Sequence, residues 1–508
     1  MKLAKKMKMK LKMMTMILVN IFQNNYMTFL LNIFKKIIPK NFLDKLRPIY
    51  HYFLSYLAAV FYGFPSNKLI VIGITGTSGK TSSVYLMAKA LNQAGYKTGY
   101  TSTAMFGDGD KEWLNDKKMT MVGRFFTQKM LSQMVKNGCV YAIVETTSEG
   151  IRQFRHRFIN YDIACFTSLY PEHIESHGSF ENYKKAKGNL FSHLKRCKTK
   201  YVDADKKVVK IKNNLSKINF NKVKKTIIAN GDNEHSSFFT NFWSEDKIIY
   251  RFGDFNEQNF FSIFYNNISV VDRKISFDIF FEKKVAGNNE IVNKKINLVL
   301  LGEFNVLNSL PLLSLAINQE IDLDLIIDNL GKIKNIPGRI EIVDADQKFL
   351  AIVDYAYEPV ALEKLYRTID SMRDEKKSGK LIHILGSAGG GRDKSRRPIL
   401  GEMAGSKADF VIVTNEDPYD ENPLDIINQV AVGAKSVGKI EGNNLFRILD
   451  RREAVRKALS LISSEDDIVL ITGKGSEQAI CLKDGKKDPW DDRLVLREEI
   501  VNYKNIIL

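Results

Sequence analysis

The chain has 508 residues, 44% of them hydrophobic and 26% charged, which is enough for about three domains with apolar cores. Its four cysteines are scattered without a CxxC pair, which argues against a zinc site or a disulfide framework and fits a reducing cytoplasm. The formal net charge is +18, but no aromatic-basic module for RNA or DNA accompanies it, so we expect no nucleic-acid partner.

Residues 1–66 form a basic, apolar N-terminal segment unlike the rest of the chain. Residues 1–48 hold eleven Lys/Arg and one acidic residue, and residues 49–64 are apolar and aromatic. No apolar stretch reaches the ~20 clean residues of a membrane-spanning helix. Two interpretations stay open: an amphipathic segment in peripheral contact with an anionic membrane, and a helical cap packed on the next domain.

The next segment has the layout of a nucleotide-binding α/β domain. Residues 68–74 are a β-branched run that predicts a buried parallel strand, a Gly/Thr turn follows, and residues 82–94 have helical spacing. Further strands are expected at 141–144 and 163–167, and each ends in polar residues. Because parallel strands present their carboxyl ends to one crevice, these polar residues should meet near the turn.

The rest of the chain predicts two further regions. Residues 206–300 contain alternating runs such as 274–281, which we interpret as antiparallel strands without obvious chemistry. After Pro337–Gly338, strands at 349–353, 381–385, 410–413 and 468–471 alternate with helices, as in a smaller Rossmann-like domain. We therefore expect an α/β protein with a P-loop central domain at 67–336, a C-terminal domain at 337–508 and an atypical helical N-terminal segment at 1–66.

The most specific motif is the glycine-rich loop from Gly73 to Thr81, GITGTSGKT. Its glycines let backbone N–H groups face phosphate oxygens, Lys80 can reach the terminal phosphates, and the Thr81 hydroxyl suits Mg²⁺. The generic loop has glycine where this chain has Ile74, so the match is to the subtype TGTxGKT. The loop predicts ATP and Mg²⁺ as ligands.

A second group of polar residues follows the predicted strands on the side of this loop. Glu145 begins the run ETTS, His173 lies in PEH, and Lys187 follows Tyr183 by four positions. A carboxylate and an imidazole there could hold a metal ion that bridges ATP and an acyl group. Taken singly, such a histidine is more often a packing or capping residue, and such a lysine a solvated charge.

Together these motifs resemble the Mur ligase family from about Leu69 to about Glu499. TGTSGKT, ETTS, FTSL through His173, HG and YxxxK correspond to family motifs in the central region. GEFNxxN, PGR, DYAY, GGGRDK and GKGSE correspond to motifs further on. The resemblance implies an ATP-dependent, ADP-forming ligase of peptidoglycan precursor synthesis. Its partners would be UDP-N-acetylmuramoyl-L-alanyl-D-glutamate and a free diamino acid, joined through an acyl phosphate.

The resemblance also implies a role for each candidate site residue. Catalysis would rest on Lys80, His173 and a carbamylated Lys187. ATP would be bound by Gly76, Thr77, Gly79, Lys80, Thr81, Asn305, Arg339, Asp354 and Lys394. Mg²⁺ would be held by Thr81, Glu145, His173 and Lys187. The acceptor would meet Thr120, Thr147, Gln153 and Arg155. The incoming amino acid would meet Arg392, Glu416, Asp417, Tyr419, Gly473 and Glu477.

The sequence departs from the family pattern at several places. Tyr357 and Ser476 replace histidines, only 72 residues precede the phosphate loop, and MTMV at 119–122 stands where the family has NTTP. The signature DNPR, whose arginine pairs with a distal carboxylate, appears as EDPY at 416–419. Because acidic residues surround it, we expect a lysine- or ornithine-like substrate, unless this loop is only solvated surface.

Two other functions stay open at the level of the sequence. A folate- or polymer-type amino-acid ligase would share this architecture and use a different carboxylate acceptor. A non-catalytic, membrane-associated ATP-binding protein would explain the basic N-terminus. It would not require Lys80, Glu145 and Lys187 together.

Overall fold

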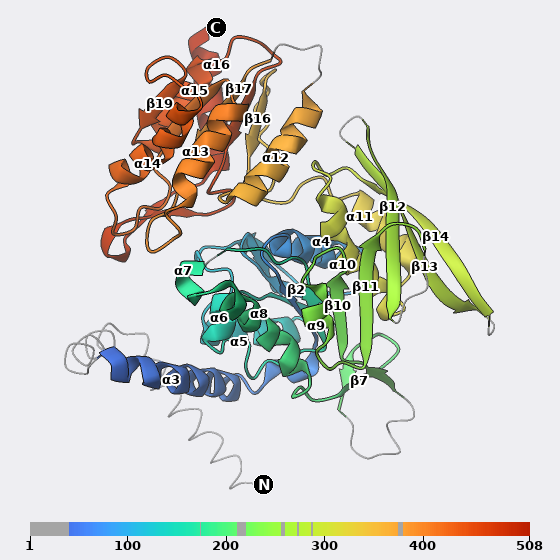
Figure 1. Ribbon diagram of the computed structural model, residues 1–508. Helices are drawn as coiled ribbons and strands as arrows, with labels where there is room; N and C mark the ends of the chain where they lie inside the picture. The colour runs from blue at the N-terminus through green and yellow to red at the C-terminus, as the bar shows by residue number, and fades with distance from the viewer. Residues whose placement is uncertain are drawn as a thin grey trace.

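The computed structural model describes residues 40–172, 174–210, 220–255, 260–271, 274–285, 288–373 and 379–507. Two α/β domains follow an N-terminal helix, and the C-terminal domain lies over the edge of the central domain where α4 and α7 are found (Figure 1). The predicted fold class is confirmed: a P-loop domain with a largely parallel sheet precedes a smaller Rossmann-like domain.

The central domain is built on an eleven-stranded sheet with the order β14-β13-β12-β11-β10-β6-β1-β5-β2-β3-β4. Its strands are β1 (Ile70–Thr75), β2 (Thr98–Thr101), β3 (Met105–Gly107), β4 (Glu112–Leu114), β5 (Tyr141–Glu145), β6 (Ile163–Phe166), β10 (Thr226–Asn230), β11 (Asp246–Phe252), β12 (Phe261–Val271), β13 (Lys274–Val285) and β14 (Asn288–Leu298). A small side sheet contains β7 (Lys200–Val202), β8 (Val208–Val209) and β9 (Asn221–Val223).

Helices cover both faces of this sheet because the central strands are apolar on both sides. Ile70, Ile72 and Ile74 of β1 pack in the core beside α4, whereas Val71 packs in the core beside α5 and α8. The helices are α4 (Lys80–Gln93), α5 (Arg124–Lys136), α6 (Ser148–Arg152), α7 (Ile174–His177), α8 (Phe180–Leu194), α9 (Ser236–Thr240), α10 (Asn305–Asn318) and α11 (Leu323–Gly331).

The strands of residues 206–300 correct one expectation. They were expected to be antiparallel, but β10 pairs in parallel with both β6 and β11, and β11 pairs in parallel with β12. The expectation holds for the rest of this region, where β12, β13 and β14 pair antiparallel and where β8 and β9 pair antiparallel with β7 in the side sheet. Alternation of apolar residues shows that one face is buried but does not specify the direction of the neighbouring strand.

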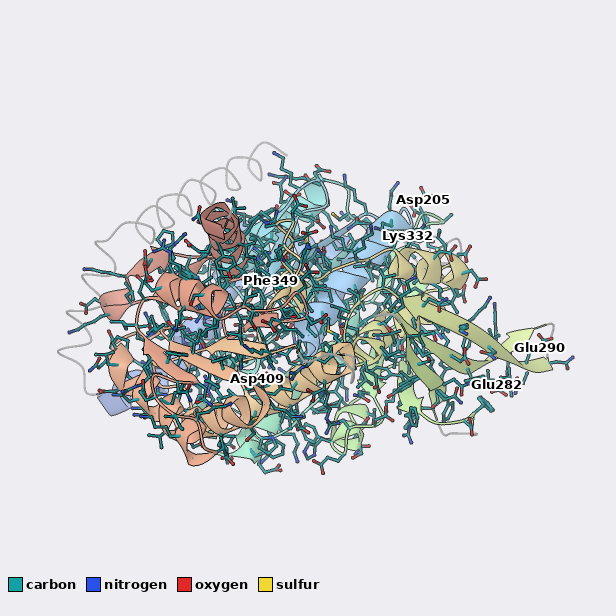
Figure 2. All side chains as sticks on the ribbon, turned by 90° about the horizontal axis from the view of Figure 1, so that it is seen from above. Asp205, Glu282, Glu290, Lys332, Phe349 and Asp409 are labelled. Carbon is teal, nitrogen blue, oxygen red and sulfur yellow. The ribbon has the colours of Figure 1, made fainter. Side chains whose placement is uncertain are left out.

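Figure 2 shows Glu282 and Glu290 of the β13–β14 hairpin at the far end of the molecule from Asp409.

The C-terminal domain has a six-stranded sheet with the order β15-β16-β20-β17-β18-β19, parallel except for β15. Its strands are β15 (Glu341–Ile342), β16 (Leu350–Val353), β17 (Leu381–Leu385), β18 (Phe410–Thr414), β19 (Leu445–Ile448) and β20 (Ile468–Ile471). The helices are α12 (Pro359–Met372), α13 (Arg396–Lys407), α14 (Pro423–Ser436), α15 (Arg451–Ser460) and α16 (Asp492–Ile507). Residues 479–489 form the hairpin of β21 (Ala479–Cys481) and β22 (Lys487–Pro489), joined by η3 (Lys483–Gly485).

Helix α3 (Lys40–Phe61) precedes the central domain, and η1 (Pro65–Lys68) leads into β1. One face of α3 packs on the central domain: Ser55 Oγ donates to the Phe154 carbonyl at 2.9 Å, and Ala58 and Ala59 are buried. The opposite face exposes apolar side chains. No helix in the part of the chain that the structure describes is long and apolar enough to span a membrane. Residues 1–39 lie outside the described residues.

Candidate active site

The phosphate loop joins β1 to α4 and leaves room only for glycine at two of its positions. Gly79 has φ of +82°, and a Cβ there would lie 2.7 Å from Asn308 Oδ1. A Cβ on Gly76 would lie 2.0 Å from Thr167 Oγ1. Helix α4 begins at Lys80, so the backbone N–H groups of its first turn have no helical partners and can bind an anion.

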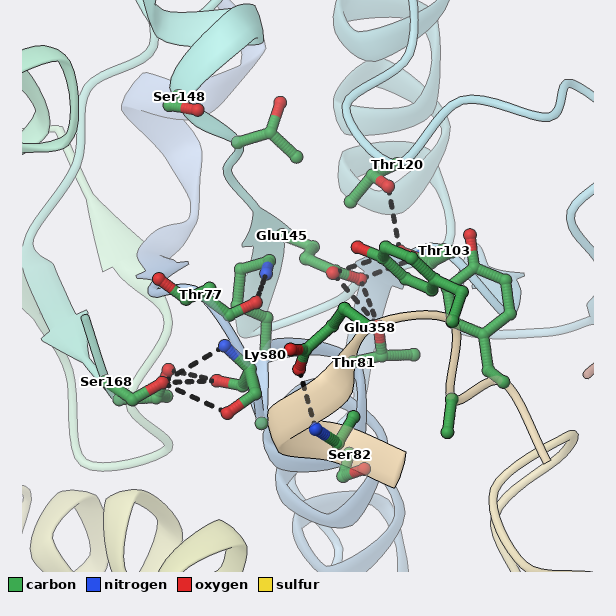
Figure 3. Close-up of a pocket in the computed structure, with 18 of the residues that line it drawn as sticks. Thr77, Lys80, Thr81, Ser82, Thr103, Thr120, Glu145, Ser148, Ser168 and Glu358 are labelled. Carbon is green, nitrogen blue, oxygen red and sulfur yellow. Dashed lines mark hydrogen bonds between the residues drawn. The ribbon is translucent and has the colours of Figure 1, made fainter. Parts of the chain in front are cut away.

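Strand register brings Glu145 to this loop. β1 pairs in parallel with β5, with Ile74 opposite Glu145, so the carboxylate lies where β1 enters the turn. Thr81 Oγ1 donates to Glu145 Oε1 at 2.9 Å, and the Thr103 N–H donates to Glu145 Oε2 at 2.7 Å (Figure 3). Glu145 is 1% exposed. The predicted Thr81 and Glu145 are therefore adjacent, and Thr103 joins them without having been expected from the sequence.

Two lysines that line the cavity side of the loop donate to its carbonyl groups. Lys80 Nζ donates to the Thr77 carbonyl at 2.8 Å, and burial lowers the pKa of Lys80. Lys187 projects from α8, is 2% exposed and donates to the Gly76 carbonyl at 2.7 Å. Burial, followed by the charge of Lys80, holds the pKa of Lys187 well below its usual value. Lys187 is thus not a solvated surface charge, which was the alternative considered from the sequence.

The oxygen atoms beside the loop suit a magnesium ion. Mg²⁺ prefers one or two carboxylates completed by phosphate oxygens and water, and the Glu145 carboxylate with the Thr81 hydroxyl meets this need. The predicted ligand His173 lies outside the described residues. Within those residues no group of three or more His, Cys, Asp or Glu side chains is placed to hold a metal.

The start of the C-terminal domain reaches back to the phosphate loop. Arg339 Nη2 donates to Thr81 Oγ1 at 3.2 Å, and the guanidinium carbon lies 4.2 Å from the centroid of the Tyr355 ring. The Asp354 carboxylate accepts the N–H groups of Ile340 at 2.8 Å and Ala356 at 2.6 Å, while burial raises its pKa. Arg339 and Asp354 therefore lie at the junction of the two domains.

The predicted amino-acid loop lies on the C-terminal side of the same space, but its acidic groups are already paired. Lys474 Nζ donates to Asp417 at 2.8 Å and to Glu477 at 2.9 Å. Lys118, from the central domain, donates to both oxygens of Asp417 at 2.9 and 2.7 Å. Burial and the neighbouring Asp417 raise the pKa of Glu416. The alternative considered from the sequence, a loop that is only solvated surface, does not hold at Glu416 and Asp417, because both carboxylates are buried beside cations.

A cavity of about 800 Å³ connects these groups. Lining residues come from both domains; among those expected from the sequence they are Thr77, Gly79, Lys80, Thr81, Thr120, Glu145, Thr147, Arg155, Lys187, Arg339, Asp354, Arg392, Glu416, Asp417, Tyr419, Gly473 and Glu477. Gly76, a residue of the loop itself, is not part of the lining, and its carbonyl accepts a hydrogen bond from Lys187 Nζ at 2.7 Å.

Besides Gly76, three expected site residues of the described chain do not line this cavity. Asn305 is buried, and its Oδ1 accepts a hydrogen bond from the Asn308 side chain at 2.9 Å. It is Asn308 that lines the cavity. Gln153 is engaged by Glu149 and Arg155. Lys394 is 59% exposed in its side chain and pairs with Glu421 at 3.1 Å. These positions were assigned from motif spacing, which does not report the direction of a side chain.

Sequence reasoning missed several polar residues of the cavity. Tyr170 donates to Glu358 at 2.8 Å and so links the two domains. Glu172, from the expected motif PEH, does not line the cavity, and burial, followed by the Glu358 carboxylate, raises its pKa to about 7. Lys118 lies in the run NDKK, which reads as solvated surface. Lys474 lies outside the lining but pairs with its residues Asp417 and Glu477, and the motif GKG gave a signal for it.

A P-loop domain that faces a second α/β domain across a polar cavity defines a two-domain nucleotide-dependent enzyme. The Mur ligase middle domain matches residues 74–316, and the Mur ligase, glutamate ligase domain matches residues 338–475. The chain belongs to the Mur ligase family, whose members are ATP-dependent amino-acid ligases.

Similar proteins cover most of the chain. A UDP-N-acetylmuramyl-tripeptide synthetase of Roseiflexus sp. (strain RS-1) is 32% identical over 88% of this chain and 81% of its own length. A UDP-N-acetylmuramoyl-L-alanyl-D-glutamate–2,6-diaminopimelate ligase of Halalkalibacterium halodurans is 31% identical over the same shares. A solved UDP-N-acetylmuramoyl-L-alanyl-D-glutamate–2,6-diaminopimelate ligase matches with a TM-score of 0.52 at 23% sequence identity, over 90% of this chain and 83% of its own. A solved Mycobacterium tuberculosis folylpolyglutamate synthase matches with a TM-score of 0.58 at 15% sequence identity, over 82% of this chain and 91% of its own.

Proposed function

We propose that this chain adds a diamino acid, as the third residue, to UDP-N-acetylmuramoyl-L-alanyl-D-glutamate with conversion of ATP to ADP. The observation that carries the proposal is one cavity lined by the phosphate loop, by Lys187 and by Asp417 of the opposite domain. The names of the relatives support the acceptor, because they are tripeptide synthetases and 2,6-diaminopimelate ligases.

In the proposed reaction the acceptor carboxylate attacks the γ-phosphorus of ATP, which forms an acyl phosphate and releases ADP. The neutral amine of the amino acid then attacks the acyl carbon, so a C–N bond forms and phosphate leaves. The loop amides and Lys80 would hold the phosphates, and Arg339 would complete the site from the C-terminal domain. The residues mainly position the reactants and stabilise developing negative charge.

Magnesium and a carbamate are the cofactors that this site would use. Bound Mg²⁺ would neutralise phosphate charge, with Thr81 and Glu145 as ligands from the described residues. Lys187 is suited to carbamylation because burial lowers the pKa of its amine and so favours the neutral form, which can add to CO₂. The resulting anion would lie beside the loop backbone at Gly76.

The activity is tested by phosphate release from ATP in the presence of the UDP-dipeptide and each candidate amino acid. We expect release that requires both the acceptor and the amino acid, with a tripeptide product visible by mass spectrometry. A dihydrofolate or polyglutamate acceptor serves as the comparison. Turnover with that acceptor and none with the UDP-dipeptide would contradict the proposal in favour of a folate- or polymer-type ligase.

The exposed face of α3 supports a second proposal, peripheral binding to an anionic membrane. Leu46, Ile49, Tyr50, Phe53 and Tyr56 follow helical spacing and are each more than 40% exposed. The excess of ten positive charges in residues 1–48 complements anionic lipid. In Figure 1, α3 lies at the edge of the central domain away from the C-terminal domain.

Vesicle sedimentation tests this surface. The protein is expected to sediment with phosphatidylglycerol-containing vesicles and not with pure phosphatidylcholine, and the double variant Ile49→Ser, Phe53→Ser is expected to sediment less. Wild-type protein that stays in solution with anionic vesicles would contradict membrane binding and favour a different occupant, such as a second copy of the chain.

A further inference from the structure

Lys118 connects the central domain to the amino-acid loop of the C-terminal domain. Its Nζ lies 2.7 Å from the Asp417 carboxylate and 2.8 Å from the Glu477 carboxylate, and it donates to the Ala479 carbonyl at 2.6 Å. Only 4% of its side chain is exposed. These three acceptors belong to the opposite domain, so the lysine is fully coordinated only while the two domains lie together.

The backbone at Lys118 is shaped for this position. Its φ is +52°, in the left-handed region that non-glycine residues seldom adopt. Neighbouring Asn115 fixes the turn, since its side-chain amide donates to the Ser102 carbonyl at 2.8 Å and the Met119 carbonyl at 3.0 Å. A strained backbone held by buried hydrogen bonds is typical of residues whose side chains must point to a fixed place.

The charged groups around the amino-acid loop have a net positive charge. Asp417 and Glu477 face two ammonium groups, those of Lys118 and Lys474. Arg392 lines the same cavity and adds a guanidinium. Glu416, which lines the cavity next to Asp417, is buried, and burial together with the charge of Asp417 disfavours its charged form. An incoming side-chain ammonium would therefore meet carboxylates whose charge is already neutralised.

We propose that Lys118 is a specificity-determining residue: by pairing Asp417 and Glu477 it leaves the amino-acid subsite cationic, so that the ligase prefers a side chain ending in a carboxylate and an amine to one ending in an amine alone. This inference rests on the proposed ligase function. It reverses the expectation of a lysine- or ornithine-like substrate, because that expectation counted the acidic groups of the loop without their partners.

Lys118 differs from Lys474 in a way that makes it the residue to test. Lys474 has no exposed side-chain surface and pairs with Asp417 and Glu477 inside its own domain, so its removal would leave buried carboxylates unpaired within the fold. Lys118 reaches the subsite from the other domain. Lys117 is the matched control, since it is the preceding lysine, 44% exposed, and pairs with Asp116 at 2.5 Å.

The experiment measures kcat/KM for phosphate release with the UDP-dipeptide and either meso-2,6-diaminopimelate or L-lysine. The wild type is expected to prefer diaminopimelate by about tenfold or more, the scale of one charge-assisted contact. Lys118→Met is expected to move this ratio about tenfold toward lysine. Lys118→Arg, which keeps the charge, and Lys117→Met are expected to keep the wild-type ratio.

Two results would overturn the inference while leaving the ligase function intact: a wild type that prefers lysine, and a Lys118→Met variant that loses both substrates in equal proportion. Absence of phosphate release with every amino acid would instead overturn the proposed function. In that case the inference is tested by calorimetric titration of each amino acid into the wild type in the presence of AMP-PNP and Mg²⁺. Lysine that binds as tightly as diaminopimelate, or more tightly, would overturn the inference on its own. Thermal unfolding verifies that Lys118→Met is folded.

Discussion

Replacing Lys187 with alanine is expected to lower the rate of phosphate release by about two to three orders of magnitude, the scale of losing one preorganised electrostatic group. Lys187 Nζ lies 2.7 Å from the Gly76 carbonyl of the phosphate loop and lines the same cavity. Because burial lowers the pKa of this amine and so favours its neutral form, CO₂ can convert it to an anion beside the proposed magnesium ligands Thr81 and Glu145. Alanine removes the only atom to which CO₂ can add at this position.

The matched control is Lys185→Ala, on the same helix two positions earlier, where the side chain is exposed. Lys185→Ala should keep wild-type turnover and the wild-type melting temperature. Wild-type activity should also fall in buffers purged of CO₂ and return when bicarbonate is added, whereas Lys187→Ala should not respond. A Lys187→Ala variant that turns over at the wild-type rate would remove the carbamate from the mechanism.

Local patterns predicted the strands and the loop that build the phosphate side of the cavity. β17 and β20 have the expected bounds, β5, β6, β16 and β18 differ by one residue at one end, and β1 starts two residues and ends one residue later than expected. These strands are short apolar runs bounded by polar residues, so their own sequences define them. The motif TGTSGKT fixes the loop in the same way, since only glycine fits at Gly76 and Gly79.

The amino-acid side of the cavity depends on contacts between distant segments, which no local pattern contains. Lys118 and Asp417 are 299 positions apart, and Tyr170 and Glu358 are 188 apart. Composition therefore suggested an acidic loop, while the fold surrounds its buried carboxylates with lysines. The direction of β10 and β11 is likewise absent from the local pattern. Their parallel pairing follows from the crossovers that bring them beside β6, and the alternation of apolar residues does not specify strand direction.

Replacing Lys80 with alanine should give the second large effect, a loss of roughly 10³-fold in kcat/KM for ATP. Lys80 is the only lysine of the phosphate loop, and its Nζ lies 2.8 Å from the Thr77 carbonyl, within the curve of the loop. Burial lowers its pKa, and the negative charge of bound phosphates would raise it again, so the ammonium would be most stable when ATP is present. Alanine would leave the phosphate charge without this partner.

Lys89→Ala is the control for this variant, because Lys89 lies on α4 as well, with 27% of its side chain exposed and its partner Glu112 near the surface. Calorimetric binding of AMP-PNP separates two causes of the loss. If Lys80 mainly anchors ATP, affinity should fall in proportion to kcat/KM; if its charge acts mainly on the transferring phosphoryl group, affinity should change little while kcat falls. Normal turnover by Lys80→Ala would mean that ATP does not bind against this loop, and the magnesium and carbamate assignments beside it would fall with it.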